Sequence, residues 1–549
     1  MTRCQRIIAW GLFSLSMLVG SGLLLADHLT PQATGQDSRA LPVQLDQTAL
    51  DRELQPILDA HPGETGAIML SDGLDAFAAR AMSARHAGRS LDLQYYIWHN
   101  DLTGRLLGRE AWQAAERGVR VRLLLDDVNA VGKDVGLMAL DVHPNVEVRV
   151  YNPFRNRSGV RRLLEMLQRV FSLNHRMHNK AWIADNRVAI LGGRNIGVEY
   201  FSASSSSNFH DLDLLLFGPT VADASTIFDA YWNSDAAVPL AVLGEADEDE
   251  IAELEATIGD ESRSRSARRY LDRVEGSRNV RDYLAKQLAP HWSANYAVVS
   301  DPPLKGLDDD VDGERLVDRI QRHLRSARDK VMLISPYFVP GDAVTDALVA
   351  MARSGVHVGI ITNSLAANDV VAVHGGYATY RPRLLEGGVH LYEIRAQPRH
   401  GASDGESGSN ADDNDGVGSG SGAGSGSGSG SGIGSGASGG ASLHTKAFLV
   451  DDRHGFIGSF NMDPRSANLN TEMGVFFDHP GLAADLKREY LHLAGPAMSY
   501  WTWVDDDGDV HWLDRAAEPP KLYHSEPEAG AWRRAQAAVM RWLPIESQL

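Results

Sequence analysis

The sequence HTKAFLVD at residues 444–451 is repeated earlier in the chain as HNKAWIAD at residues 178–185. Both stretches follow the pattern H-x-K-x-x-x-x-D. Each leads into a glycine-containing turn that ends in asparagine, GGRN at 192–195 and GSFN at 458–461. One copy of so short a pattern is a weak signal. Two copies with matching downstream asparagines indicate a duplicated functional unit.

Each motif predicts a short buried strand. Residues 446–450 and 180–184 are apolar, partly β-branched, and followed by turn-forming residues. Alternate residues of a strand share one face, so each histidine should point the same way as the lysine two positions later. Asp185 and Asp451 lie an odd number of residues past their histidines, where the strand should turn. We therefore interpret these two motif aspartates as turn formers with a structural role.

Helices and strands are expected to alternate in the same order in two parts of the chain. The periodicity predicts helix, strand, helix and strand at 74–86, 91–98, 106–117 and 119–126, and again at 316–327, 331–339, 342–353 and 356–362. This alternation is typical of α/β proteins. We predict two tandem α/β/α sandwich domains, residues 65–240 and 310–500, packed face to face around one shared active site.

The remaining segments are expected to connect or extend these halves. Residues 241–309 are interpreted as a connector and residues 501–549 as a C-terminal hairpin and helix. Residues 401–441 are almost wholly Gly, Ser and Asp, a composition that cannot bury enough apolar surface to offset the entropy of ordering. We expect a disordered insertion there, either without function or acting as a lid over the site.

The N-terminal segment, residues 1–27, is expected to be a signal anchor or a cleaved signal peptide. Arg3 and Arg6 precede a run of mostly apolar residues that is close to the roughly 20 residues needed to cross a bilayer. We prefer the uncleaved anchor, because the apolar run continues past the small residues that would suit cleavage. The arginines should stay cytoplasmic. The body would then face the other side, after a polar tether at 28–64.

Composition limits the class of protein. The chain has 549 residues, enough for two or three domains. Its formal net charge is −19, which argues against a nucleic-acid partner, because binding to a phosphate backbone calls for a basic surface. The single cysteine, Cys4, excludes an internal disulfide and a cysteine-based zinc site.

The paired motifs suit phosphodiester chemistry without a metal or another cofactor. Displacement at an anionic phosphodiester needs positive charge and hydrogen-bond donors where the transition state forms. Lys180, Lys446, Asn195 and Asn461 can supply them. One motif histidine can attack phosphorus to form a phosphohistidine, while the other protonates the leaving oxygen and then deprotonates the incoming alcohol.

Each imidazole, His178 and His444, needs a carboxylate that orients its far nitrogen. Asp211 follows the first motif and Glu472 follows the second, so they are the candidates. The residues alone do not decide which histidine attacks and which transfers protons.

The duplicated motif resembles the phospholipase D superfamily, and the resemblance covers residues 70–515. The finer similarity is to the bacterial cardiolipin synthase C subgroup, and it rests on four stretches: YYIW at 95–98, GGRNIG at 192–197, TNSLAAND at 362–369 and DPRSANLNTE at 463–472.

This resemblance implies a phosphatidyl-histidine intermediate and transfer of a phosphatidyl group from phosphatidylethanolamine or phosphatidylglycerol to phosphatidylglycerol. It implies that His178 is the nucleophile and His444 the general acid and base. It also implies an acceptor pocket near Tyr337-Phe338 and residues 374–377, although a packing role for these residues is an equal alternative. The implied location is the bacterial inner membrane, with the catalytic body on the periplasmic face.

The first half departs from the superfamily pattern at one position. Gly193 stands where many members have serine, whereas the second half has Ser459 at the corresponding place. The first half-site therefore lacks one hydroxyl donor.

Two segments are candidates for membrane contact. Residues 155–176 hold six arginines and one glutamate, with apolar residues at helical spacing, a pattern typical of an interfacial helix on anionic lipid. An amphipathic helix packed on its own domain is the alternative. The second candidate is the tryptophan- and arginine-containing stretch 532–542.

Three other functions share parts of this pattern. A hydrolytic phospholipase D would use the same chemistry but give the intermediate to water. A nuclease is opposed by the net charge and the N-terminal apolar segment. A non-enzymatic scaffold would be expected to carry a degraded motif, and both copies are complete. We therefore expect phospholipid substrates, a membrane location and no nucleic acid.

Overall fold

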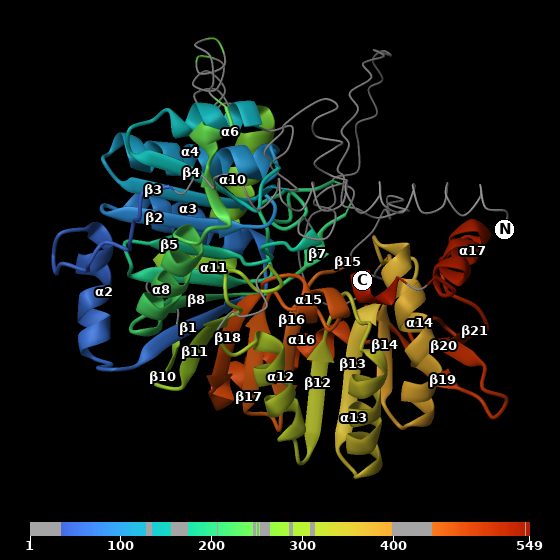
Figure 1. Cartoon of the computed structure of the whole chain (residues 1–549). Helices are drawn as coiled ribbons and strands as arrows, with labels where there is room; N and C mark the ends of the chain where they lie inside the picture. The colour runs from blue at the N-terminus through green and yellow to red at the C-terminus, as the bar shows by residue number, and fades with distance from the viewer. Residues whose placement is uncertain are drawn as a thin grey trace, which may run out of the picture.

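The computed structural model describes residues 35–127, 134–154, 174–205, 207–244, 264–284, 289–307, 313–397, 442–543 and 545–549, together with the single residues 249 and 252. These residues form two stacked α/β halves, with the first half drawn above the second in Figure 1.

The first half is built on a nine-stranded sheet in the order β10-β1-β8-β6-β5-β2-β3-β4-β9. The strands are β1 Thr65–Leu70, β2 Ser90–Tyr95, β3 Arg120–Asp126, β4 Val146–Tyr151, β5 Ala181–Ala184, β6 Val188–Gly192, β8 Asp213–Phe217, β9 Ala237–Pro239 and β10 His291–Ser293. β2, β3 and β4 are parallel to one another, and the other neighbours are antiparallel.

The second half is built on a ten-stranded sheet in the order β11-β18-β17-β16-β12-β13-β14-β19-β20-β21. The strands are β11 Tyr296–Ser300, β12 Lys330–Ile334, β13 His357–Asn363, β14 His390–Ile394, β16 Lys446–Val450, β17 His454–Gly458, β18 Met473–Asp478, β19 Ser499–Val504, β20 Val510–Asp514 and β21 Lys521–Tyr523. The order β1-β8-β6-β5-β2-β3-β4 of the first sheet matches β11-β18-β17-β16-β12-β13-β14 of the second. The predicted duplication is therefore confirmed by topology.

Helices cover both faces of each sheet, as predicted for an α/β/α sandwich. The outer faces carry α3 Gly73–His86, α4 Leu102–Glu116, α10 Arg265–Gly276 and α11 Arg278–Leu284 in the first half, and α12 Leu316–Arg325, α13 Gly341–Arg353 and α14 Val371–Glu386 in the second. The inner faces carry α8 Thr220–Trp232 and α16 Pro480–Leu493. The shorter or peripheral helices are α2 Ala49–Asp59, α6 Asp134–Asp141, α15 Pro464–Asn468 and α17 Ala531–Met540, with 3₁₀ turns at Leu240–Val242 and Glu546–Gln548.

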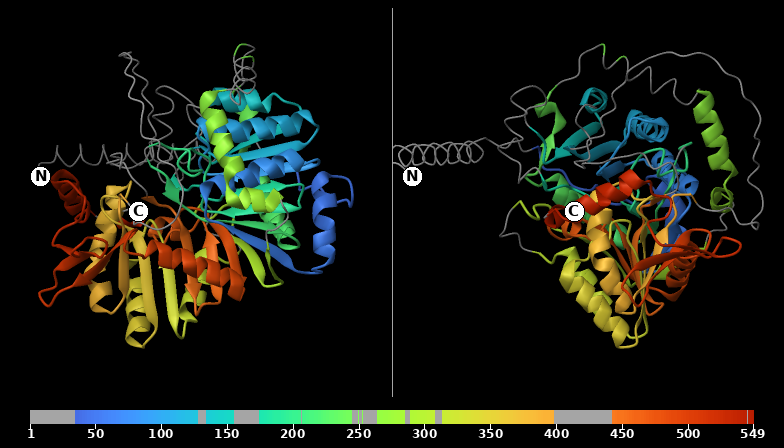
Figure 2. Two further views of the ribbon diagram at one scale, coloured as in Figure 1. Left: turned by 180° about the vertical axis from the view of Figure 1, so that it is seen from behind. Right: turned by 90° about the vertical axis from the view of Figure 1, so that its right-hand side faces the viewer.

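The inner faces of the two halves share one hydrophobic core. Ile183 and Trp232 of the first half belong to the same buried cluster as Leu449 and Leu486 of the second. Because alternate residues of a buried strand face opposite layers, the neighbouring Trp182 belongs to the outer core of the first half. A two-stranded sheet of β7 (Phe209–His210) and β15 (Ser442–Leu443) also joins the halves. Both halves thus form one body (Figure 2), and the predicted face-to-face packing is confirmed.

Two predicted strands are shorter than expected. β2 ends at Tyr95, not at residue 98, and β12 ends at Ile334, not at residue 339. Past Tyr95 the chain turns to other partners: the N–H of Ile97 donates to Asn195 Oδ1 (3.2 Å), and Trp98 forms an isolated bridge with Ile196. The apolar pattern continued because these residues stay partly buried at the end of the sheet.

Two segments that we interpreted as linking chain contribute to the halves. Residues 35–64 include α2, which begins with a capping box on Thr48 and buries Leu50. Residues 241–309 supply β10 to the first sheet and β11 to the second, so the chain crosses between halves within a few residues. The hairpin expected near residues 501–512 is present as β19 and β20.

Several predictions concern residues outside the described part of the chain. They are the N-terminal anchor or signal segment, the first part of the tether, residues 155–173 of the candidate interfacial helix, and the insertion at 401–441. Among the helices that the structure describes, none has the length and apolar character needed to span a bilayer.

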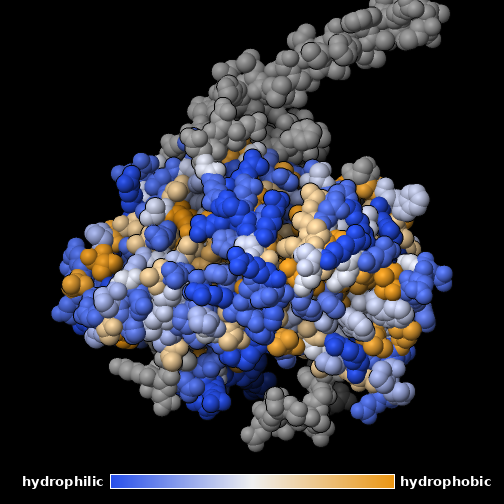
Figure 3. Space-filling model, turned by 90° about the horizontal axis from the view of Figure 1, so that it is seen from below, coloured by the Kyte–Doolittle hydropathy of each residue, from blue (hydrophilic) through white to orange (hydrophobic). Residues whose placement is uncertain are grey.

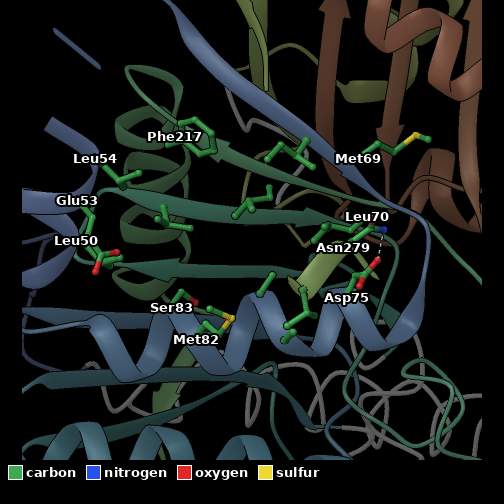
Figure 4. Close-up of a pocket in the computed structure, with 16 residues that line it drawn as sticks. Leu50, Glu53, Leu54, Met69, Leu70, Asp75, Met82, Ser83, Phe217 and Asn279 are labelled. Carbon is green, nitrogen blue, oxygen red and sulfur yellow. Dashed lines mark hydrogen bonds between the residues drawn. The ribbon is translucent and has the colours of Figure 1, made fainter. Parts of the chain in front are cut away.

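A cavity of about 170 Å³ lies between the first sheet and α3 (Figure 4). Its wall is mainly apolar and includes Leu54, Met69, Met82 and Phe217, with Asp75 at one end. It contains none of the residues predicted for the active site. Seen from below, the surface is mainly hydrophilic, with apolar residues in small separate groups (Figure 3).

Candidate active site

The two motif histidines lie where the backbones of the halves meet. The N–H of His178 donates to the carbonyl of Thr471 (2.9 Å), which belongs to the second half. The N–H of His444 donates to the carbonyl of His210 (2.8 Å), which belongs to the first half. Each half therefore holds the other half's histidine in place at a single shared site.

The carboxylates that face the imidazoles are exchanged between the halves. Nδ1 of His178 lies 2.8 Å from Oε2 of Glu472, and Nδ1 of His444 lies 2.6 Å from Oδ2 of Asp211. Both predicted carboxylates thus contact motif histidines, but each contacts the histidine of the opposite half. With Nδ1 held by a carboxylate, Nε2 of each ring is the nitrogen left for a substrate.

Glu472 sits in a dense polar environment. The hydroxyls of Ser459 and Ser466 donate to its two oxygens, and its own N–H donates to Asp301 Oδ2 (3.0 Å). Burial raises the pKa of Glu472 to about 7, although Lys180 and the two serines act in the opposite direction. Near neutral pH, Glu472 is therefore close to the boundary between its charged and neutral forms.

Asp211 differs from Glu472 because its neighbour is Gly193. A Cβ at residue 193 would lie 2.1 Å from Asp211 Oδ1, so the aspartate fills the space that a serine would need. Burial raises the pKa of Asp211, but His444 and Lys446 outweigh it and hold that pKa below its usual value. Because the first half has Gly193 in place of a serine, Asp211 lacks a hydroxyl donor like the one that Ser459 provides to Glu472.

Both motif lysines fold back onto their own histidine residues. Nζ of Lys180 donates to the carbonyl of His178 (2.5 Å). Nζ of Lys446 lies 2.8 Å from Nδ1 of His444 and also donates to that residue's carbonyl. Burial lowers the pKa of Lys446 to about 8 and the pKa of Lys180 well below its usual range. A bound anion would restore the charged form of both.

The surroundings of both histidines favour the neutral imidazole. Burial, followed by the charges of Lys180 and Lys446, lowers the pKa of His178 well below its usual value. Burial and the charge of Lys446 lower the pKa of His444 to about 4, although Asp211 acts to raise it. Lys180 also lowers this pKa, by a smaller amount. Since the lysine of each half also acts on the histidine of the other, the two half-sites are electrostatically one site.

The two predicted asparagines have different surroundings. Asn195 accepts the N–H of Ile97 and donates to the hydroxyl of Tyr200 (3.0 Å). Oδ1 of Asn461 is buried and accepts no hydrogen bond from the described part of the chain. Asn195 therefore supports neighbouring residues, whereas Asn461 keeps a free polar group.

Aromatic rings that sequence reasoning did not predict enclose the imidazoles. Tyr96 lies edge-on to His178, with ring centroids 5.1 Å apart. Phe209 stacks on His444 at 5.4 Å, and Tyr200 lies edge-on to it at 5.2 Å. Tyr96 belongs to the YYIW stretch, which was a usable signal. Phe209 lies two residues before the predicted carboxylate, and nothing in its pattern distinguishes it from core.

The motif aspartates lie at the far ends of β5 and β16 from the histidines, in the left-handed region at φ 54° for Asp185 and 51° for Asp451. The carboxylate of Asp185 accepts backbone N–H groups from three successive residues, Gly88, Arg89 and Ser90. Asp451 accepts the same three-residue pattern from Arg328, Asp329 and Lys330. Each aspartate thus ties the end of a motif strand to the start of its neighbour.

We expect Asp185→Ala to lower the free energy of unfolding by about 2 to 4 kcal/mol, because it leaves the buried N–H of Ser90 and the partly buried N–H groups of Gly88 and Arg89 without an acceptor, and a buried unpaired group costs about 1 to 3 kcal/mol. Asp451→Ala is a matched control with the same backbone conformation. Its donors Arg328 and Asp329 are solvent-exposed, so water can replace the carboxylate and the loss should be about 1 to 2 kcal/mol. Urea unfolding of both variants checks this order. Equal losses would contradict it.

Three of the residues considered for an acceptor pocket are hydrogen-bonded to other side chains, and two of these, His374 and Tyr377, are buried. Tyr337 donates to Asp369 (2.8 Å), and His374, which is 1% exposed, contacts Glu526 at 3.1 Å. The hydroxyl of Tyr377 donates to Glu393 (3.0 Å). Tyr337, His374 and Tyr377 thus each have an acidic side chain as partner.

One described group of side chains has the types that bind metals. Ligand atoms of His99, Asp101 and Glu199 lie within 4.8 Å of one another. Both oxygens of Asp101 already accept backbone N–H groups, from Gly104 and Val198, and His99 Nδ1 lies 3.2 Å from Glu199. We assign no metal to this group.

A duplicated α/β fold with one shared His-Lys site at the junction defines a protein of the phospholipase D class. A family model described as cardiolipin synthase, PLD-like domain, matches residues 82–232, 320–403 and 431–494. The chain belongs to this family.

Relatives of known sequence or structure agree with this assignment. Over 491 residues the chain is 38% identical to cardiolipin synthase C of Escherichia coli, a match that covers 89% of this chain and 98% of that protein. It is 33% identical over 478 residues to an uncharacterized protein of Helicobacter pylori, covering 85% and 86%. The crystal structure of phosphatidylserine synthase from Haemophilus influenzae matches with a TM-score of 0.53 at 13% identity, covering 89% and 96%. That structural match supports the fold alone.

Proposed function

We propose that the protein is a phosphatidyltransferase that makes cardiolipin, with phosphatidylethanolamine or phosphatidylglycerol as donor and phosphatidylglycerol as acceptor. The observation that carries this proposal is the exchanged pairing of His178 with Glu472 and of His444 with Asp211. This pairing provides two oriented imidazoles at one site. The 38% identity to cardiolipin synthase C of Escherichia coli supports the choice of substrates.

In the first step, Nε2 of His178 attacks the phosphorus of the donor. A P–N bond forms, the P–O bond to the headgroup alcohol breaks, and His444 gives its proton to the leaving oxygen. Glu472 accepts the N–H of His178 as the ring gains positive charge, which stabilises the phosphatidyl-histidine. The pKa of His444 is low without substrate, and the anionic phosphodiester favours the protonated ring that this step needs.

In the second step, the hydroxyl of phosphatidylglycerol attacks the same phosphorus. His444 takes the hydroxyl proton, a P–O bond forms, and the P–N bond to His178 breaks. Lys180 and Lys446 stabilise the added charge of each transition state, because both are buried beside the histidines. The enzyme returns to its starting protonation after both steps.

Product identification by lipid mass spectrometry tests this function. Purified full-length protein would receive phosphatidylglycerol alone and then phosphatidylglycerol with phosphatidylethanolamine. Cardiolipin is the expected product, with release of glycerol or ethanolamine. Phosphatidic acid as the sole product would show that water is the acceptor, and the protein would then be a hydrolytic phospholipase D.

We also propose a location in the bacterial inner membrane with the catalytic body on the periplasmic face. The arginines and apolar run at the start of the sequence support this orientation. Protease added to intact spheroplasts should digest the body. Complete protection, with digestion only after lysis, would place it in the cytoplasm.

The pH dependence of kcat/KM should reflect the deprotonation of Lys446, the motif lysine of the second half. The pKa of Lys446 is about 8, lowered mainly by burial, so this lysine loses its charge as the pH rises through that value. We expect kcat/KM, which reflects free enzyme, to fall above about pH 8. The limb in kcat should lie higher, because the bound phosphodiester raises the lysine pKa. A kcat/KM that stays constant from pH 7 to pH 10 would contradict this. The control is Lys521→Arg, at an exposed position, which should leave the pH profile of kcat/KM unchanged.

A further inference from the structure

The C-terminal helix α17 is held against the second half of the protein. Its buried side packs on α14 through Ala537 and Met540, where Gly375 allows a close approach: a Cβ there would lie 3.0 Å from both. The guanidinium of Arg533 donates to the carbonyls of Leu365 (2.8 Å) and Asn368. Figure 1 shows α17 beside α14 at the edge of the second half.

The residues after α17 run back to the site. The N–H of Arg465 donates to the carbonyl of Leu549 (2.7 Å). The guanidinium of Arg465 donates to the carbonyl of Asn174 (3.0 Å), four residues before His178. The same short helix, α15, carries Ser466, which donates to Glu472. The C-terminal segment is therefore fixed to the elements that position the first histidine.

Within the described part of the chain, the opposite side of α17 is apolar and exposed. Its exposed residues are Ala531, Trp532, Ala535, Ala538 and Val539, followed beyond the helix by Arg541, Trp542 and Leu543. Trp532, Ala535 and Val539 follow helical spacing on one face. Trp532 is 76% exposed and Trp542 is 88% exposed. Such exposure of two tryptophans within one short segment is unusual for a surface that stays in water.

This concentration is specific to the C-terminal segment. Of the ten large apolar side chains that are exposed among the described residues, four lie between residues 532 and 543. The others, such as Ile57, Val242 and Leu491, are scattered singly, which is normal for a protein surface.

We propose that this face, Trp532, Ala535, Ala538, Val539, Trp542 and Leu543, docks on an anionic phospholipid bilayer and presents the site to it. The inference rests on the proposed lipid substrate. Tryptophans with flanking arginines suit the interface between headgroups and acyl chains. The exposed Arg541 and the partly exposed Arg534 lie beside this face, in a chain whose net charge of −19 would otherwise be repelled by anionic lipid.

A fluorescent label measures the docking directly. The single Cys4 is replaced by serine in the full-length protein, and Trp542→Cys or Leu491→Cys is labelled with an environment-sensitive dye. Both native residues are exposed, at 88% and 54%, so position 491 is a matched control. In vesicles of phosphatidylglycerol and phosphatidylethanolamine, the dye at 542 should shift to the blue and be quenched by brominated lipid, whereas the dye at 491 should do neither. Equal behaviour of the dye at both positions would overturn the docking surface. The same result is expected if this face binds a protein and not a bilayer.

Turnover separates docking from chemistry. The double variant Trp532→Ser, Trp542→Ser should make cardiolipin about tenfold or more slowly from vesicles, yet act normally on short-chain phosphatidylglycerol dissolved as monomers. Leu491→Ser should act normally on both substrates. Wild-type rates of the double variant on vesicles would overturn the docking surface alone. Failure of the wild type to convert either lipid into cardiolipin would instead overturn the proposed function.

Discussion

Replacing His178 by alanine is expected to reduce cardiolipin formation by about 10⁴-fold or more, because it removes the atom that bonds to phosphorus. His444→Ala should cause a loss of similar size, since neither leaving group nor acceptor can then exchange a proton at the site. Both rings are almost fully buried, so folding should be checked by circular dichroism and thermal unfolding. His454→Ala, at a half-exposed position of the second half, serves as the control and should retain full activity.

The two histidine variants should differ in the intermediate. With labelled phosphatidylglycerol and a quench at alkaline pH, His444→Ala should gain label on the protein slowly and then retain it, because the first step lacks its acid and the second step lacks its base. His178→Ala should retain none. Mass spectrometry of the labelled peptide should find the phosphatidyl group on His178. Label on His444 in the His178 variant would reverse the assigned roles while leaving the two-step chemistry intact.

The architecture was predictable because its signals are local. The motif strands show as apolar runs ending in aspartate, and the structure places β5 and β16 on those runs. The order of strands and helices in each half also follows from periodicity and repeats at a recognisable spacing. The ends of β2 and β12 were not predicted, since the residues beyond them stay buried or partly buried although they leave the ladder.

The site was only partly predictable because its contacts are distant in sequence. Asp211 and Glu472 were found as candidates, but their exchange between halves depends on how the two sheets dock, which no local pattern reports. The support of Glu472 by Ser466 and Asp301 has the same origin. The tryptophans and arginines of residues 532–542 can be seen in the sequence. Only the structure shows that Ala537 and Met540 pack against the second half while Trp532 is exposed.

Glu472→Gln is expected to reduce turnover by about 10³- to 10⁴-fold, because an amide cannot stabilise the positive ring that forms when the histidine becomes phosphorylated. Asp211→Asn should show a loss of similar order through the other histidine. Both changes preserve shape. Glutamine keeps one of the two oxygens that accept from Ser459 and Ser466, and the other serine hydroxyl can rotate to accept from the amide NH2. The fold should therefore be kept, and the loss should appear in kcat.

The exchange between halves makes these two variants distinguishable. Since Glu472 contacts His178, Glu472→Gln should slow formation of the labelled intermediate and leave little label on the protein. Since Asp211 contacts His444, Asp211→Asn should resemble His444→Ala and let the label accumulate. The order along the chain suggests instead that each carboxylate pairs with the histidine of its own half. In that case Asp211→Asn would leave little label on the protein and Glu472→Gln would let it accumulate. A double-mutant cycle gives a second measure: Glu472→Gln should add almost no further loss to His178→Ala, because residues that act as one unit are not additive. An additive loss in that pair would mean that Glu472 acts on the reaction by a route other than His178.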